Sequence, residues 1–310
     1  MNVVRGFLAE VRFLPTSLLL LTTLLGGFFA AGPSVNWHVM GLVLLNAFCY
    51  IYVAHNWDTF QDYYRKGEYE EGRRFHNKRL HSEAYLPRWG FGGEIPDAPI
   101  LSKKCYLAAI AFFSVLGVFV MAYVSAIVGL GYSAIAIGGL ALALAYSAGL
   151  DRIPALGDTM WELGVLLAMW CGYYSQKQAL DLFIMSTSVP LFISLISIKA
   201  LDSLPDTIVD DKQSKVTLTV FLYRKGLGLK AIRHVCYLPF YVAFLILYYT
   251  LPSNLRLGAL AVILAFIIQQ LALHKDEKGR LSIVAASFTI LAFIVAALVV
   301  IAGLATLPSI

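Results

Sequence analysis

Residues 105–126 read CYLAAIAFFSVLGVFVMAYVSA, a run without a single charged side chain. A transmembrane helix needs about 20 mostly apolar residues to cross the hydrocarbon core. The run is continuously apolar, whereas a strand of a membrane barrel alternates apolar and polar residues. Eight further stretches have the same character: 13–32, 37–57, 129–150, 157–176, 182–201, 234–251, 255–274 and 282–304. The sequence therefore predicts an all-α, polytopic membrane protein with nine transmembrane helices.

The overall composition agrees with this class. Of the 310 residues, 59% are hydrophobic and 14% are charged, and the mean hydropathy is +0.73. Soluble domains carry about 25% charged residues, and disordered chains are poor in apolar residues, so both classes are excluded. The four cysteines are far apart in sequence, and we expect neither a disulfide nor a metal–thiolate site. We expect a single membrane domain over residues 1–310.

Basic residues predict the orientation of the chain. With nine spans, the N-terminus and the connections after even-numbered spans share one side, and that side carries 21 of the 24 Lys and Arg residues. The opposite side carries only Lys177 and Arg256, and Lys199 falls inside a span. The positive-inside rule therefore places the N-terminus and these connections in the cytoplasm of a cell-membrane protein. The net charge of +5 fits contact with anionic lipid headgroups, and we expect no nucleic-acid partner.

Two long cytoplasmic connections, 58–104 and 202–233, hold most of the carboxylates, and we expect them to form a cap over an active site. The first begins with Asp58 and Asp62, four residues apart. The second begins with three aspartates at the same spacing, which stacks them on one helical face: Asp202, Asp206 and Asp210. At 5–6 Å and an effective dielectric of ~20, each neighbouring pair of carboxylates costs about 3 kcal/mol, so a cation must offset the repulsion. Carboxylates near phosphate-binding cations are typical of Mg²⁺ sites.

These motifs resemble those of a known family. The stretch DSLPDTIVDDKQSKVTLTV, from Asp202 to Val220, is similar to the second aspartate motif of the UbiA superfamily of intramembrane prenyltransferases. The stretch HNWDTFQDYYRKGE, from His55 to Glu68, resembles the first motif, in the form found in menaquinone-type members. Its spacing differs from the family pattern, so the parts played by Asn56, Asp58 and Asp62 stay open. Tyr146-Ser147 and the segment after Arg12 resemble shorter family motifs.

The resemblance implies nine helices around a central, lipid-accessible cavity. It also implies Mg²⁺-dependent transfer of a polyprenyl group from an isoprenyl diphosphate to a small aromatic acceptor, such as a quinone precursor. The implied metal ligands, which are also catalytic, are Asp58, Asp62, Asp202 and Asp206. Tyr146 is implied to be catalytic as well, because an aromatic face stabilises an allylic cation. The residues expected to contact substrate are Arg12, Asn56, Arg65, Lys66, Arg73, Arg74, Ser147, Lys199, Asp210, Lys212 and Lys215.

Three alternatives stay open at this stage. The acceptor can be a glycerol-phosphate lipid. The enzyme can be an intramembrane terpene cyclase, which uses the same diphosphate and no acceptor. The chain can also be a transporter, although no inverted repeat or matched pair of broken spans is found in the sequence.

Overall fold

The structure, a computed structural model, describes residues 7, 11, 13–61, 64, 101–150, 153, 156–204, 207–212 and 216–250. Seven long helices account for most of these residues, and no strand occurs among them. The long helices are α2 (Phe13–Ala31), α3 (Trp37–Gln61), α5 (Lys103–Val128), α6 (Gly131–Ser147), α7 (Leu156–Lys177), α8 (Leu182–Ser203) and α11 (Leu229–Thr250). The short ones are the 3-10 helix η1 (Gly32–Ser34), α9 (Thr207–Lys212) and α10 (Leu218–Arg224).

The long helices coincide with the first seven predicted spans. The largest differences are at α3, which continues through Gln61 instead of ending at residue 57, and at α11, which begins at Leu229 instead of residue 234. Among the described residues, three helices are long and apolar enough to cross a membrane, by length and composition alone: Thr16–Ser34, Trp37–Gln61 and Lys103–Val128. The prediction of an all-α polytopic membrane protein is confirmed. The predicted spans 255–274 and 282–304 lie outside the described residues.

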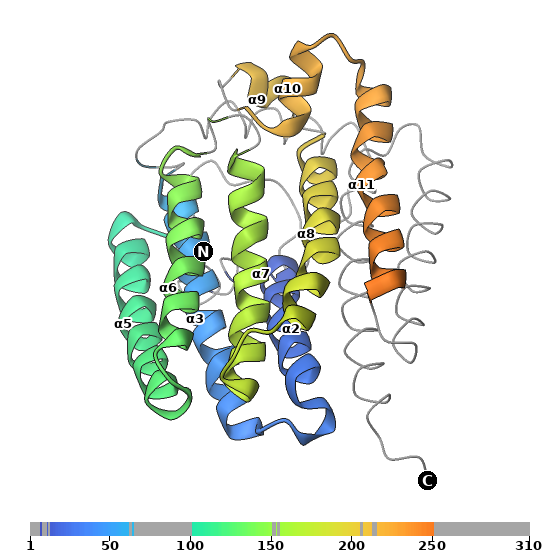
Figure 1. Ribbon diagram of the computed structural model, residues 1–310. Helices are drawn as coiled ribbons and strands as arrows, with labels where there is room; N and C mark the ends of the chain where they lie inside the picture. The colour runs from blue at the N-terminus through green and yellow to red at the C-terminus, as the bar shows by residue number, and fades with distance from the viewer. Residues whose placement is uncertain are drawn as a thin grey trace.

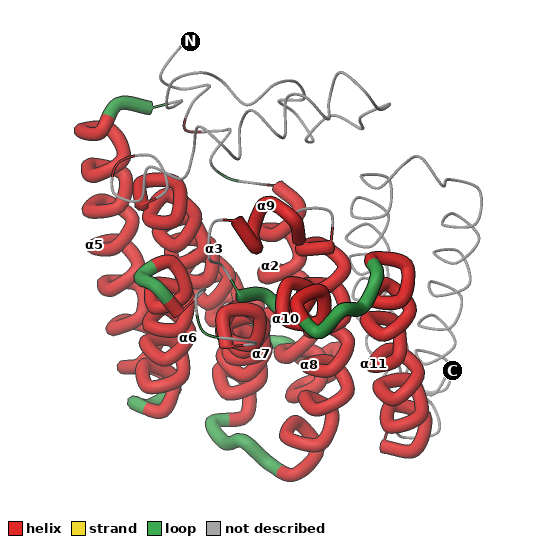
Figure 2. The backbone as a smooth tube through the Cα atoms, turned by 90° about the horizontal axis from the view of Figure 1, so that it is seen from above, coloured by secondary structure: helices red, strands yellow, loops and turns green. Residues whose placement is uncertain are grey.

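The helices run side by side and alternate in direction along the chain (Figure 1). Seen end-on, α7 lies inside the group, where it packs against α2, α3, α6 and α8 (Figure 2). Glycines permit the closest of these contacts. A Cβ atom built on Gly26 of α2 lies 1.9 Å from the carbonyl oxygen of Met169, and one on Gly172 of α7 lies 1.9 Å from that of Thr23. Small residues let membrane helices approach to backbone contact, and here they bring α2 against α7.

Buried hydrogen bonds tie the other helices together. The Asn46 amide of α3 donates to the carbonyl oxygen of Gly117 in α5 at 2.8 Å and accepts from the Tyr132 hydroxyl of α6 at 2.9 Å. The Trp170 indole of α7 donates to the Ser188 hydroxyl of α8 at 2.7 Å. Polar groups that are satisfied across helices in this way fix how neighbouring helices align.

The segment after α8 differs from the sequence prediction. Three stacked aspartates on one helical face require a continuous helix over residues 202–210, but α8 ends at Ser203 and α9 begins at Thr207. Pro205 explains the break, because proline has no N–H to donate and its ring clashes with the preceding turn. Asp202 and Asp210 therefore belong to different helices. The short helices α9 and α10 lie across the end of the bundle where α8 finishes (Figure 1), joined by an ion pair of 2.6 Å between Arg224 and Asp211.

Candidate active site

Two residues singled out in the sequence meet at this end of the bundle. Asp58 lies in the last turn of α3, and Ser147 is the last residue of α6. The Ser147 hydroxyl, 2% exposed, donates to a carboxylate oxygen of Asp58 at 2.9 Å. The two positions are 89 residues apart in sequence. The bond holds the carboxylate in one orientation, as a ligand or proton acceptor requires. Tyr146, adjacent to Ser147, is half-buried at the same helix end.

The structure does not bring Asn56 to this pair. Asn56 and Asp58 are two residues apart on one helix, so their side chains point about 160° apart at 3.6 residues per turn. Asn56 is fully buried, and its amide donates to the Tyr52 carbonyl oxygen at 2.8 Å. Its Oδ1 has no hydrogen-bond partner among the described residues.

Two stacked aromatic rings, one from α3 and one from α7, lie at the face of α3 that carries Asp58. His55 precedes Asp58 by three residues and therefore shares its helical face. The His55 ring stacks on Trp161 of α7, with 5.9 Å between centroids and 21° between planes. Neither residue was assigned a site role from the sequence, because an aromatic residue in an apolar span carries no signal of its partner. By contrast, Trp57 stacks on Phe60 in a separate cluster with Leu101 and Tyr106.

A second carboxylate was also missed in the sequence. Glu162, next to Trp161, is only 3% exposed inside α7. An ionisable side chain inside a membrane span is costly to bury and tends to be functional, and this was a signal available in the sequence.

For the other predicted site residues, the structure describes the side chain, the backbone alone, or neither. Lys199 of α8 and Asp210 of α9 are half-buried near the end where α8 finishes. Asp202 and Lys212 are placed at the ends of α8 and α9, but their side chains are not described. The following predicted residues lie outside the described residues: Arg12, Asp62, Arg65, Lys66, Arg73, Arg74, Asp206 and Lys215.

The ends of the first long connection lie close together. Tyr64 donates to the Leu101 carbonyl oxygen at 3.2 Å, and both residues belong to the cluster that buries Phe60 and Tyr106. Tyr64 and Leu101 therefore lie together beside the end of α3 that carries Asp58.

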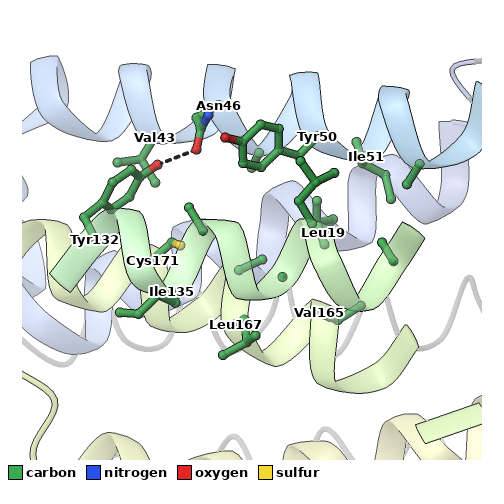
Figure 3. A pocket seen from close by; sticks show the side chains of 18 of the residues that line it. Leu19, Val43, Asn46, Tyr50, Ile51, Tyr132, Ile135, Val165, Leu167 and Cys171 are labelled. Atoms are coloured by element: carbon green, nitrogen blue, oxygen red, sulfur yellow. Dashed lines mark hydrogen bonds between the residues drawn. The ribbon is translucent and has the colours of Figure 1, made fainter. Parts of the chain in front are cut away.

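An apolar pocket lies among the helices (Figure 3). Its lining begins at Ala54 and Ala143, about one helical turn from Asp58 and Ser147. It lies between α2, α3, α6 and α7 and contains about 570 Å³ of space, part of it open to the outside. At the Asp58 end its wall includes Ala54, Ala143 and Trp161. At the opposite end are Asn46, Tyr132 and Cys171. The arrangement suits a ligand with a charged head at Asp58 and a long apolar tail inside the bundle.

The donor atoms at the head of this pocket suit magnesium. Carboxylate oxygens are the ligands that Mg²⁺ prefers, and Asp58 supplies them next to a hydroxyl group. Within the part of the chain that the structure describes, no group of three or more His, Cys, Asp or Glu side chains is close enough to hold a metal ion. Of the four predicted ligands, only Asp58 has a described side chain.

No protein-family model matches the sequence, and no curated protein matches it significantly. Solved structures with the same fold do exist. A UbiA homologue from Archaeoglobus fulgidus, bound to DMAPP and Mg²⁺, superposes with a TM-score of 0.64 at 13% identity, covering 95% of this chain and 99% of that one. The apo form of a UbiA homologue from Aeropyrum pernix K1 gives 0.63 at 14% identity, covering 92% and 96%.

A third solved structure is described as a digeranylgeranylglyceryl phosphate synthase in membranes. It superposes with a TM-score of 0.61 at 14% identity, covering 98% of this chain and 99% of the other. This chain therefore has the fold of UbiA homologues over nearly its whole length, which agrees with the resemblance found in its two aspartate motifs.

Proposed function

We propose that this protein is an intramembrane prenyltransferase that moves a prenyl group from its diphosphate to an acceptor within the membrane. The observation that carries the proposal is the Asp58–Ser147 pair about one helical turn from the head of an apolar pocket. A prenyl diphosphate has this same division into a charged head and a long apolar tail. Two structures of A. fulgidus UbiA homologues with the same fold hold DMAPP or GPP together with Mg²⁺, and this supports the assignment.

Asp58 would hold Mg²⁺ together with the predicted ligands Asp62, Asp202 and Asp206. The bound ion supplies positive charge that stabilises the departing diphosphate. In the reaction, the bond between the first prenyl carbon and the diphosphate oxygen breaks, and its electron pair leaves with the diphosphate. The acceptor forms the new bond to that carbon and loses a proton.

The chain's own residues act on the prenyl group. Ser147 orients Asp58, and the apolar walls exclude water, which would otherwise capture the allylic cation. Trp161 faces the pocket near its head, where an aromatic ring stabilises developing positive charge by about 1–2 kcal/mol. The wider predicted site adds Tyr146, Lys199 and Asp210 at the same end of the bundle.

The rest of the proposed arrangement follows from the charge pattern. The end of the bundle that bears Asp58 faces the cytoplasm, with residues 58–104 and 202–233 as a cap over the pocket. The helices α9 and α10 belong to the segment 202–233 and lie across this end of the bundle, which supports a role for that segment in the cap (Figure 1).

Two acceptor classes are candidates. The menaquinone-type character of the first motif favours an aromatic quinone precursor. The likeness to a digeranylgeranylglyceryl phosphate synthase favours a glycerol-phosphate lipid. The two differ chemically, because an aromatic ring forms a carbon–carbon bond and a glycerol hydroxyl forms an ether.

An acceptor panel separates these candidates. Purified protein in lipid nanodiscs is incubated with Mg²⁺, labelled geranylgeranyl diphosphate and either a dihydroxynaphthoate, a hydroxybenzoate or geranylgeranylglyceryl phosphate. We expect a labelled lipid product and an equal amount of diphosphate with one acceptor class. Diphosphate release without any acceptor would instead indicate a cyclase, and no release under any condition would contradict the proposed activity and favour a transporter.

A further inference from the structure

The far end of the apolar pocket is lined by two hydrogen-bonded side chains, Tyr132 and Asn46. Tyr132 is fully buried, and its hydroxyl donates to Asn46 Oδ1 at 2.9 Å (Figure 3). Asn46 is in turn held by the bond from its Nδ2 to the Gly117 carbonyl oxygen of α5. The ring therefore cannot swing away without breaking a buried hydrogen bond, which makes this end of the pocket a rigid floor.

The distance from the head of the pocket to this floor follows from helix geometry. Asn46 and Asp58 are twelve residues apart on α3, which is a rise of about 18 Å at 1.5 Å per residue. Tyr132 and Ser147 are fifteen residues apart on α6, which gives about 22 Å. An extended isoprene unit is roughly 5 Å long, because it adds four carbon–carbon bonds of about 1.5 Å to the chain. The space between head and floor is thus roughly four isoprene units long.

We propose that the Tyr132–Asn46 pair sets the upper limit on prenyl chain length, at roughly 20 carbons. This inference rests on the proposed function, because it requires the diphosphate to bind near Asp58. Each isoprene unit up to the limit gains affinity by leaving water for the apolar walls. A longer chain meets the Tyr132 ring and gains nothing more.

A substitution at Ala136 should lower the upper limit on prenyl chain length. It lines the pocket on α6, one turn from Tyr132 towards the head, which is about 6 Å or one isoprene unit. The substitution Ala136→Leu places a larger side chain in the path of the tail. Ala134 on the same helix is exposed and does not line the pocket, so Ala134→Leu is a matched control.

The experiment measures dissociation constants of the full-length protein in nanodiscs with Mg²⁺ for geranyl, farnesyl, geranylgeranyl and geranylfarnesyl diphosphate. In the wild type and in Ala134→Leu, affinity should rise up to geranylgeranyl diphosphate and then level off. In Ala136→Leu the affinity for geranylgeranyl diphosphate should fall at least tenfold while that for geranyl diphosphate stays within twofold. Tyr132→Ala should shift the limit in the opposite direction, towards geranylfarnesyl diphosphate.

Three results would overturn the inference. One is an unchanged length profile in Ala136→Leu. Another is an equal loss for every chain length, which would indicate a purely structural effect. The third is a wild-type affinity that keeps rising beyond geranylgeranyl diphosphate. If no prenyl diphosphate binds the wild type with Mg²⁺, the proposed function itself fails, and that outcome is distinct from the first three. If Tyr132→Ala does not fold, the comparison of Ala136→Leu with Ala134→Leu tests the inference by itself.

Discussion

Asp58 and Ser147 are the side chains on which the proposed chemistry depends most. They lie on different helices, and the hydrogen bond between them is 2.9 Å long. The serine is almost fully buried, so the carboxylate it contacts is partly shielded from competing water. A charge in such a position interacts more strongly with a metal ion or a diphosphate than one in bulk water.

Substitution of these two residues should weaken ligand binding to different extents. Asp58→Asn removes the charge but keeps the shape, and the affinity for farnesyl diphosphate with Mg²⁺ should fall at least a hundredfold, about 3 kcal/mol. Ser147→Ala removes only the orienting bond and should cost about five- to tenfold, in line with 0.5–1.5 kcal/mol for one hydrogen bond. Calorimetric titration in nanodiscs measures both.

The ion pair between Asp211 and Arg224 provides a control for the Asp58 and Ser147 variants. Asp211→Asn breaks a partly exposed pair with Arg224, and such pairs contribute little, so the affinity should stay within twofold. Wild-type affinity in Asp58→Asn, with an unchanged melting temperature, would remove Asp58 from the site.

At the scale of helices, the crossing of α2 and α7 supports one wall of the pocket. Gly26→Ala or Gly172→Ala would place a methyl group 1.9 Å from a backbone carbonyl oxygen, so the helices must separate. We expect a loss of about 2–3 kcal/mol in stability and a clear drop in melting temperature. In Gly41→Ala of α3, nothing lies within 4 Å of the added methyl group, and stability should hold or rise by up to about 1 kcal/mol. Equal melting temperatures for Gly172→Ala and Gly41→Ala would contradict the close packing.

The turn between α7 and α8 depends on Asp181. One of its carboxylate oxygens accepts from the Ile184 N–H at 3.2 Å, capping α8, and the other accepts from Lys177 at 2.5 Å and from Tyr173 at 2.7 Å. Asp181→Ala removes both functions and should lower stability by about 1 kcal/mol, whereas Asp181→Asn keeps a side-chain cap and should cost less. Thermal unfolding at neutral pH compares the two, and an equal cost would show that the ion pair, not the cap, stabilises the turn.

The same residue predicts a dependence on pH. The Lys177 ammonium and the Tyr173 hydroxyl hold the pKa of Asp181 at about 2, below the ordinary 3.8. Because the pKa is lowered in the folded state, the ionised group stabilises the protein above about pH 4, and this stabilisation is lost as the pH falls towards 2. The difference in melting temperature between the wild type and Asp181→Asn should therefore shrink between pH 5 and pH 3. A constant difference in melting temperature over this pH range would contradict the lowered pKa of Asp181.

At the scale of the whole molecule, the positive charges predict that the Asp58 end faces the cytoplasm. Ala179 in the α7–α8 turn and Lys225 after α10 are exposed at opposite ends of the bundle. On intact cells, a membrane-impermeant maleimide should label Ala179→Cys but not Lys225→Cys, with the wild type as the background for its four cysteines. Labelling of Lys225→Cys but not of Ala179→Cys would show that the chain has the opposite orientation in the membrane.

Much of this architecture could be predicted because a bilayer imposes a fixed length on apolar helices. The starts and ends of α2, α5, α7 and α8 fall within two residues of the predicted spans. Helical periodicity alone places Asn56 and Asp58 on different faces of α3, and Pro205 in the sequence indicates a break between α8 and α9. By contrast, the stacking of His55 on Trp161 and the Tyr132–Asn46 bond arise from contacts between helices, and no local pattern encodes them.

In the proposed function, the end of the bundle that bears Asp58 binds a prenyl diphosphate through Mg²⁺. The most direct test is the dissociation constant of farnesyl diphosphate for the purified full-length protein in nanodiscs, measured with Mg²⁺ and again with excess chelator. We predict binding at least tenfold tighter with Mg²⁺, because the carboxylates repel the diphosphate when no cation lies between them. Equal affinity in the two conditions, or no binding in either, would contradict the account.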